Sequence, residues 1–555
     1  MNHDRKWAAL AVLAAGLSLI VLDGTIVGVA LPAIIADLRL DLTDAQWVNS
    51  LYSVVFAALL LTFGRLGDRF GRRSLFLAGV TVFVAGSVVA AFASGAEQLI
   101  ASRALQGVGG ALVLPSTLST VNATFRGRDR AVAFGVWGAV MAGMAAIGPL
   151  LGGVLTTWLD WRWIFLVNVP LGIAVVAAGV AWVPESRGRI DAPGADVLGL
   201  LLSAGGLGLL VFGLIEGNSL GWWTPTADFP LLGFVWGQDA PVSLPAAAIG
   251  VGIVLVGLFL GWEGRRGFFG RSALLDLRLF RIGTFAWGNL TAGMVAVAEF
   301  ALVLVVPLFL VNVLGLDIMG AGLVLAAMAF GAFLSGAMAR HVAARFGAPR
   351  VVTLGLALEV AGVAVTALAL SRTTSPWLLA ITLAVYGLGL GLASAQLTST
   401  VLADVPTAQS GAASATQSTV RQLGSAFGSA IGGTALAVSL HATLPAHLAE
   451  FGLTGRAASG LVDATVLSAG SNIPGLVAAG AHGRFGDRTP QLAAALADGF
   501  ARATSSALWI AAAFLALGLI GSLVVSAQAN RQAAARASDD SQQPTDVSGA
   551  APSRR

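Results

Sequence analysis

Five ionisable side chains interrupt long apolar stretches of the sequence, and these residues are the most able to carry chemistry. They are Asp23, Arg103, Glu299, Glu359 and Arg421. A charge at the centre of a membrane costs about 2.5–3.5 kcal/mol on the insertion scale, so each of these residues needs a reason to be there. A buried carboxylate that binds and releases a proton is a natural proton carrier, and a fixed cation nearby can tune that exchange.

Each of these residues also has a purely structural interpretation. Asp23 could hydrogen-bond a neighbouring helix, and Arg103 could form an ion pair that only locks helices together. Glu299 and Glu359 have no polar neighbour in their runs, so either could be a protonated acid bonded to a backbone carbonyl. We favour proton coupling for Asp23 and Arg103, keep Glu299 and Glu359 as further proton-coupling candidates, and regard Arg421 as a candidate ion-pair partner.

The composition places these side chains in a membrane protein. Of the 555 residues, 56% are hydrophobic and 11% are charged, and the mean hydropathy is +0.83. Soluble proteins carry about 25% charged residues. We attribute the net charge of +4 to cytoplasmic arginines and not to nucleic-acid binding. Cysteine is absent, and His441, His447 and His482 lack ligand spacing, so we expect no metal site.

Long apolar runs predict the elements that hold these residues. Runs of about 20 apolar residues predict about fourteen spanning helices. These runs lie near 8–36, 46–66, 74–94, 98–121, 131–157, 162–184, 197–216, 244–262, 283–312, 318–339, 351–370, 376–398, 409–438 and 501–527. The expected fold is therefore an all-α integral membrane bundle.

The runs divide into two six-helix bundles, which we place at residues 1–184 and 266–530. Residues 185–265 form a cytoplasmic linker with two inserted helices. Within the second bundle, a long external loop is expected at about 440–500, and residues 531–555 are expected to be a disordered cytoplasmic tail because they are rich in Ser, Ala, Gln and Asp.

Arginine clusters predict the orientation. They lie near residues 65–73, 126–130, 187–189, 265–281, 340–350 and 531–536, all on the side of the N-terminus, whereas the alternate loops carry mostly acids. By the positive-inside rule we expect a multi-pass protein of the cell membrane with cytoplasmic N- and C-termini.

An internal repeat relates the two bundles. Gly64–Ser74 has a decayed echo at Gly336–Arg350, and the pair Gly152-Gly153 has an echo at Gly432-Gly433. The offset from motif to echo is nearly the same in the two cases. Paired halves with a site between them are common among secondary transporters.

Small residues form a packing surface in one predicted helix. The stretch 138–153 reads GAVMAGMAAIGPLLGG, and its members include Gly143, Gly148, Gly152 and Gly153. Small residues let two membrane helices approach closely. Pro149 removes a backbone hydrogen bond and is expected to bend this helix.

Six motifs follow one another along the chain. They read LDGTIVGVALP (22–32), GRLGDRFGRR (64–73), RALQGVG (103–109), GMAAIGPLLGG (143–153), WRWIFLVNVP (161–170) and DLRLF (276–280). In this order they resemble the major facilitator superfamily and, within it, the fourteen-helix drug:proton antiporters of the EmrB/QacA type. One departure is Gly28, where that group usually carries Asn, which bears on substrate range more than on mechanism.

The resemblance implies roles for several residues. It implies that the loop residues Gly64, Asp68, Arg69, Gly71, Arg72 and Arg73 are a gating latch between the halves; the alternative is a topology signal only. It implies that Gly143, Gly148, Pro149, Gly152 and Gly153 are the antiporter motif. We add as substrate-cavity candidates Trp47, Tyr52, Gln106, Trp137, Asn289 and Arg421, although lipid-facing packing is an alternative for the aromatic side chains.

The sequence argues against three other classes. Lys6 is the only lysine, so there is no nucleotide-binding GxxxxGK[ST] loop of an ATP-driven pump. The GxSxG match at 217–221 follows a spanning helix instead of a strand, so we expect no enzyme. Two halves with lone buried carboxylates suit alternating access better than a channel.

The expected function is therefore proton-coupled multidrug efflux of lipophilic, cationic amphipathic compounds. Alternatives are a dedicated exporter of an endogenous secondary metabolite, as in antibiotic self-resistance, and an uptake symporter for a nutrient. The expected partners are a small amphipathic substrate, protons and the lipid bilayer, with no nucleic acid. The proton motive force replaces any cofactor, and a monomer is expected.

Overall fold

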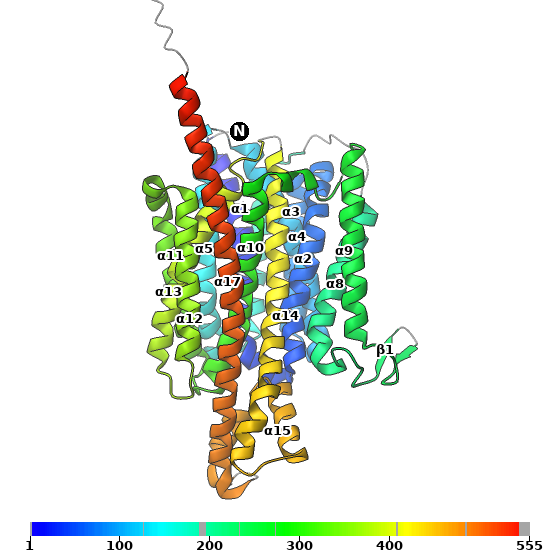
Figure 1. Cartoon of the computed structure of the whole chain (residues 1–555). Helices are drawn as coiled ribbons and strands as arrows, with labels where there is room; N and C mark the ends of the chain where they lie inside the picture. The colour runs from blue at the N-terminus through cyan, green and yellow to red at the C-terminus, as the bar shows by residue number, and fades with distance from the viewer. Residues whose placement is uncertain are drawn as a thin grey trace, which may run out of the picture.

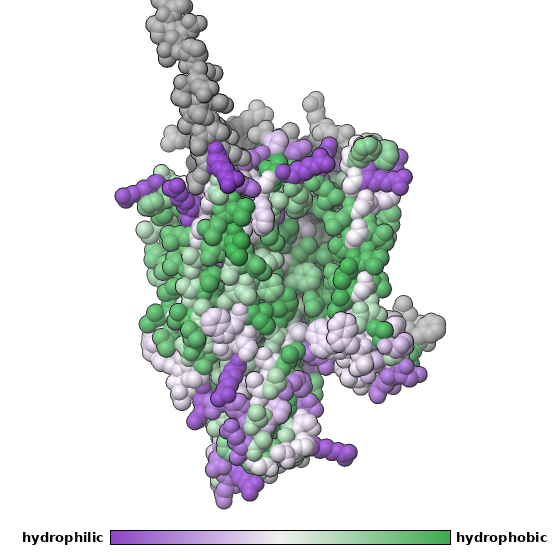
Figure 2. All heavy atoms as spheres, in the orientation of Figure 1, coloured by the Kyte–Doolittle hydropathy of each residue, from purple (hydrophilic) through white to green (hydrophobic). Residues whose placement is uncertain are grey.

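The computed structural model describes residues 3–125, 127–187, 196–231, 234–271, 273–406, 409–482 and 485–542. It is a bundle of long, nearly parallel helices (Figure 1). Among the described residues, 12 helices are long and apolar enough to cross a membrane, or 13 if a bent pair counts as one span. A broad apolar belt separates two hydrophilic ends in Figure 2. The protein is a multi-pass membrane protein.

The first helices form one side of the bundle. Their bounds are α1 His3–Leu38, α2 Leu42–Phe70, α3 Arg72–Ala91, α4 Ala96–Thr124, α5 Gly127–Trp158, α6 Trp163–Leu166 and α7 Asn168–Trp182. We call α1–α7 the N half. The start of α1 marks one end of the bundle, which we call the terminal end; the other is the far end (Figure 1).

Two inserted helices follow. They are α8 Val197–Leu220 and α9 Leu244–Phe268, which pack against each other. Between them lies a two-stranded antiparallel hairpin, β1 Phe229–Leu231 and β2 Phe234–Trp236, whose register pairs Phe229 with Trp236. A 3-10 turn, η1 Leu277–Arg281, leads to the next helix.

The remaining helices form the other side, which we call the C half. Their bounds are α10 Gly283–Asn312, α11 Ile318–Phe346, α12 Ala348–Ala369, α13 Pro376–Val401, α14 Ser410–Glu450, α15 Arg456–Leu467, α16 Asn472–Ala479 and α17 Thr489–Gln542, with short turns η3 Gly480–His482 and η4 Gly486–Arg488 before α17. Each of the predicted runs overlaps a helix. Two of those helices, α2 and α5, are not counted among the 12, since each contains residues whose side chains lie outside the described part.

The described residues differ in two places from what we expected of the C half. We expected a loop at about 440–500, but the described part of this segment is mostly helical. Helices α14 and α17 extend beyond the apolar belt, and α15 and α16 lie between their ends (Figure 1). Ala458, Val462 and Val466 recur at helical spacing and are buried, which explains why α15 folds onto the projection. The tail is also helical as far as Gln542, in keeping with its high alanine content; residues 543–555 lie outside the described part.

Two short junctions reflect the internal repeat. A single residue, Gly71, separates α2 from α3 with φ +115°, and Gly347 separates α11 from α12 with φ +85°. Such positive φ angles favour glycine because it has no Cβ. The spacing from Gly71 to Gly347 lies between the two offsets found in the sequence, so the junctions occupy equivalent places in the repeat.

Candidate functional site

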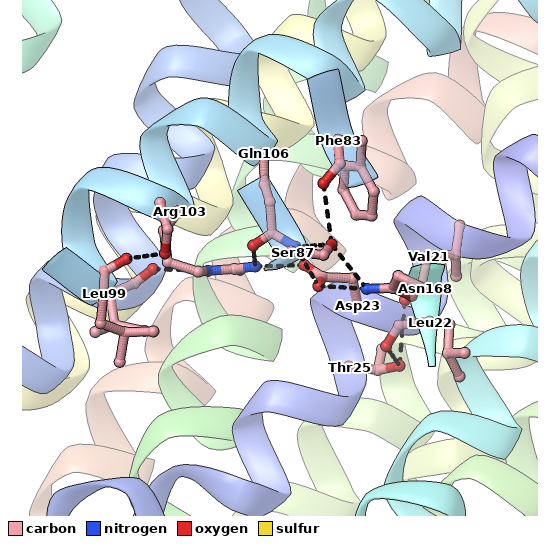
Figure 3. Close-up of polar contacts among 12 residues, drawn as sticks. Val21, Leu22, Asp23, Thr25, Phe83, Ser87, Leu99, Arg103, Gln106 and Asn168 are labelled. Carbon is pink, nitrogen blue, oxygen red and sulfur yellow. Dashed lines mark hydrogen bonds and ion pairs between the residues drawn. The ribbon is translucent and has the colours of Figure 1, made fainter. Parts of the chain in front are cut away.

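A buried polar network lies inside the N half, where four helices converge (Figure 3). Asp23 lies on α1, Ser87 on α3, Arg103 and Gln106 on α4, and Asn168 at the start of α7. Asp23 is completely buried and Arg103 is 1% exposed. The network therefore joins helices that are far apart in the sequence, around a charged pair sealed from solvent.

The carboxylate of Asp23 accepts hydrogen bonds on both oxygens. Arg103 Nη1 forms an ion pair with Oδ2. Gln106 Nε2 donates to Oδ1 at 2.8 Å, and Asn168 Nδ2 donates to the same oxygen at 3.3 Å. Both amides also donate to Ser87 Oγ, at 2.9 and 3.2 Å. These contacts fix the position of the carboxylate.

Arg103 has further partners that hold its charge in place. Its Nη1 donates to Gln106 Oε1 at 2.7 Å and its Nε to the Val48 carbonyl oxygen at 3.2 Å. The guanidinium lies 4.3 Å from the ring centroid of Tyr52, a cation–π contact. Removing one member of such a buried pair typically costs about 3–5 kcal/mol, because the other charge is left uncompensated. Protonation of Asp23 would remove its charge and weaken its attraction for Arg103.

Sequence reasoning selected Asp23 and Arg103, and the structure brings them together. Gln106 was expected at a substrate cavity; it is instead 0% exposed and bound within the network. Ser87 and Asn168 were missed. The signal for Asn168 was present, since it is the one amide side chain in the apolar run WIFLVNVPLG.

A second group of ionisable side chains lies in the C half. Glu359 on α12 is 0% exposed, Glu299 on α10 is half-buried, and Tyr386 on α13 is 0% exposed. Arg421 on α14 is half-buried and interacts electrostatically with both glutamates. The two predicted acids thus share one region, and Tyr386 is a member that sequence reasoning missed.

The glycines of α5 pack against both halves. A Cβ on Gly148 would collide with the side chain of Thr25 on α1, and one on Gly152 would lie 3.0 Å from Ile26. Gly153 faces Gly322 at the start of α11, where an added Cβ would be 3.5 Å from the Gly322 Cα. Pro149 is buried within α5, and the environment of Gly143 lies outside the described part.

The predicted latch residues that the structure describes make contacts within the N half. Arg72 donates from Nη1 to the Ser119 carbonyl oxygen at 3.2 Å, and Arg69 lies over the ring of Phe70. A Cβ on Gly71 would meet Glu185 at 2.6 Å, whereas one on Gly64 would make ordinary contact with Pro115. The side chain of Asp68 lies outside the described part.

Glu185 anchors the start of α3. It accepts hydrogen bonds from the backbone N–H of Arg73 at 3.1 Å and from Ser74 Oγ at 2.7 Å. Partial burial raises the pKa of Glu185, but the hydrogen bonds from Ser74 and from the Arg73 and Ser186 backbone outweigh it and hold this pKa below its usual value. Glu185 is therefore a negative cap on the first turn of α3.

The other cavity candidates that the structure describes make separate contacts. Tyr52 is buried beneath Arg103, and Asn289 donates to the Phe285 carbonyl oxygen of its own helix. Trp47 Nε1 donates to Glu216 Oε1 of α8 at 2.9 Å. The side chain of Trp137 lies outside the described part. Within the described residues, no cluster of acidic and histidine side chains suits a metal ion.

The two halves meet at the far end. Gln46 Nε2, near the start of α2, donates to the Ala430 carbonyl oxygen of α14 at 2.8 Å, and Ser50 Oγ donates to that of Ala426 at 3.2 Å. The Gly153–Gly322 contact between α5 and α11 is also near this end, where α11 begins. These contacts close the far end between the halves.

Helix α8 covers the seam between α2 and α14. Beside the Trp47–Glu216 bond, Thr434 Oγ1 of α14 donates to the Leu214 carbonyl oxygen of α8 at 2.9 Å. An apolar cluster of Val54, Val211 and Ala426 joins the same three helices. The inserted pair therefore contacts both halves where they are closed.

Comparisons with known proteins agree with this architecture. Residues 13–429 match the family model described as Major Facilitator Superfamily. The chain is 34% identical to the probable actinorhodin transporter of Streptomyces coelicolor, over 78% of this chain and 72% of that protein. It is 33% identical to the multidrug efflux pump LfrA of Mycolicibacterium smegmatis, over 78% of this chain and 81% of that protein.

A solved structure shares the fold. The inward-facing, unoccupied crystal structure of a bacterial homologue of the human lysosomal transporter Spinster superposes with a TM-score of 0.60. The match covers 95% of this chain and 98% of that chain at 17% sequence identity.

Proposed function

Since the chain belongs to the Major Facilitator Superfamily, and is thus a membrane transporter and not an enzyme, we propose that it exports lipophilic, cationic amphipathic compounds in exchange for protons. The observation that carries the proposal is the Asp23–Arg103 pair, sealed inside the N half by amide donors. When the buried acid of such a pair gains a proton, the fixed cation loses its counter-charge, so protonation favours a rearrangement of the helices that hold the pair. Export is supported by the relative named a multidrug efflux pump.

The proposal includes a topology. Helices α2 and α5 are 29 and 32 residues long, and a span needs about 20 residues, so we assign both to the membrane and reach fourteen spans. The arginine-rich loops lie at the terminal end, which we assign to the cytoplasm of a plasma-membrane protein. Fourteen spans and the antiporter motif support our assignment of the chain to the EmrB/QacA type, and we propose that it acts as a monomer without a cofactor.

The proposed cycle starts from the present arrangement, which is closed at the far end. Substrate binds from the cytoplasm or inner leaflet while Asp23 is ionised. The far end then opens, a proton from outside neutralises Asp23, and substrate leaves. Loss of the Asp23 charge changes the attraction between α1 and α4, which links protonation to helix movement. Reopening at the terminal end returns the proton to the cytoplasm near Arg103.

The relative named an actinorhodin transporter favours a second candidate. In that case the protein is a dedicated exporter of an endogenous secondary metabolite, and its site accepts few foreign compounds. Uptake of a nutrient is a third candidate, and the direction of counterflow in everted vesicles separates it from export.

A dye panel tests the proposed function. Purified protein in liposomes should extrude ethidium, rhodamine 6G or Hoechst 33342 when a pH gradient is imposed, and a protonophore should reduce the rate to that of protein-free liposomes. Transport of one dye only favours the dedicated exporter. Extrusion that persists at the full rate after the gradient has collapsed would refute proton coupling.

Alternating access predicts the effect of a cross-link at the far end. The native chain has no cysteine, so the pair Ser50→Cys and Ala426→Cys can form one defined disulfide between α2 and α14. Oxidation should reduce dye export by at least about tenfold, because the far end can no longer open, and dithiothreitol should restore it. The two single-cysteine proteins are the controls. Full export by the oxidised, cross-linked protein would show that α2 and α14 need not separate.

A further inference from the structure

Three buried polar groups in the C half lack hydrogen-bond partners. Both carboxyl oxygens of Glu359, the Oε2 of Glu299 and the hydroxyl of Tyr386 are buried and unpartnered among the described residues. A buried polar group without a partner is costly, and an ionised one far more so. A buried, unpartnered carboxyl group is therefore expected to be protonated, or to be retained because it has a role in function.

Close helix packing holds this group together. On α12, Glu359 lies against Gly389 of α13, where an added Cβ would be 2.9 Å from the Glu359 Cγ. One turn further along, Gly362 of α12 lies against Tyr386 of α13, and an added Cβ would be 2.6 Å from its backbone N. Glu359 and Tyr386 therefore each pack against a glycine of the opposite helix, and both lie at the interface between α12 and α13.

Two further ionisable side chains interact with this interface, and they lie on helices α10 and α14. Glu299 on α10 interacts with Glu359 and Tyr386, and Arg421 on α14 interacts with both glutamates. One cation cannot balance the charges of two neighbouring carboxylates in a low-dielectric interior. Glu299 is half-buried, whereas Glu359 and Tyr386 are fully buried, so Glu299 is the acid of this group that we expect to exchange a proton with water.

The internal repeat relates Glu299 to Asp23. The spacing from Asp23 to Glu299 along the chain is identical to the spacing between the junction glycines, Gly71 and Gly347. Asp23 lies on the first helix of the N half, and Glu299 lies on the first helix of the C half. The two halves therefore carry an acid at the same place in the repeat.

We propose that Glu299, which interacts electrostatically with Glu359, Tyr386 and Arg421, is a second proton-binding site, so that each half exchanges one proton in every transport cycle. At this site one O–H bond forms when a proton arrives from outside and breaks when it leaves to the cytoplasm, and no other bond changes. Glu359 and Tyr386 are positioning residues. The inference rests on the proposed proton-coupled export and adds a stoichiometry of two protons per substrate.

The stoichiometry can be measured in liposomes with ethidium as the probe. At zero membrane potential, the pH gradient that just cancels an ethidium gradient gives the number of protons per ethidium. We expect two for the native protein, one for Glu299→Gln, and two for Glu97→Gln, a control at an exposed acid at the start of α4. One proton for the native protein, or two for Glu299→Gln, would overturn the second site.

A substrate-free measurement separates failure of this inference from failure of the proposed function. Infrared difference spectra between acidic and alkaline pH report the C=O stretch of buried carboxylic acids. Glu299→Gln should remove a band that Asp23→Asn and Glu97→Gln retain, and Tyr386→Phe should shift that band. If Glu299→Gln leaves the spectrum unchanged, the second proton-binding site is refuted, whether or not the protein transports dye. If the band is lost but pH gradients have no effect on dye transport, only the proposed proton-coupled export is refuted.

Discussion

Asp23→Asn is expected to reduce export driven by a pH gradient by at least about tenfold, because protonation no longer alters the attraction between α1 and α4 and only the Glu299 proton is left to be exchanged. Asparagine keeps the size of the side chain and its hydrogen bond from Gln106, but it cannot exchange a proton. Arg103 keeps the Val48 carbonyl, Gln106 and the Tyr52 ring as partners, so we expect the protein to fold and insert. The measurement is ethidium efflux after an imposed pH jump, with the amount of inserted protein determined in parallel.

Two further proteins make this result interpretable. Asp4→Asn makes the same substitution at an exposed position at the start of α1 and should export at the native rate. Asp23→Asn combined with Arg103→Gln removes both charges of the pair, so it tests the same loss of proton binding without an uncompensated buried cation. Export by either Asp23 variant at the native rate would remove Asp23 from the mechanism.

The energetic cost of burying charge explains what the sequence could predict about the site. Asp23 and Arg103 were recognisable because charged residues within apolar runs are expensive and therefore rare. Asn168 is uncharged, so the same argument gave it little weight. The bonds of Gln106 to Asp23 and Ser87 could not be predicted, because a residue's position along α4 does not reveal which helices surround it. That information is tertiary, and it depends on α1, α3 and α7 meeting at one point.

The same limit applies to the fold. Long apolar runs located the helices, because continuous hydrophobicity is the strongest signal in a membrane sequence. The projection at the far end was missed because α15 is amphipathic, with buried residues at Ala458, Val462 and Val466 and exposed ones between them. A test for uniform hydrophobicity does not detect such a helix, whereas a test for helical periodicity would.

Gly148→Leu is expected to reduce export by at least about tenfold, because α5 and α1 touch at this residue. Even a Cβ at Gly148 would collide with Thr25, whose hydroxyl donates to the Val21 and Leu22 carbonyl oxygens beside Asp23. Overpacking of this kind typically costs about 1–3 kcal/mol and moves backbone, here next to the proton-binding acid. Dye efflux at a matched level of inserted protein measures the effect.

A control and a compensating variant distinguish local packing from a general intolerance of leucine. Gly257 on α9 is exposed and has no atom within 4 Å of an added Cβ, so Gly257→Leu should export at the native rate. Gly148→Ala should be impaired, and adding Thr25→Gly should recover much of the loss, because it removes both the Oγ1 and the Cβ of Thr25 that the new methyl group meets. Full export by Gly148→Leu, or no recovery in the double variant, would show that the α1–α5 contact does not limit the cycle. Recovery would instead tie the small-residue surface of α5 to the position of the helix that carries Asp23.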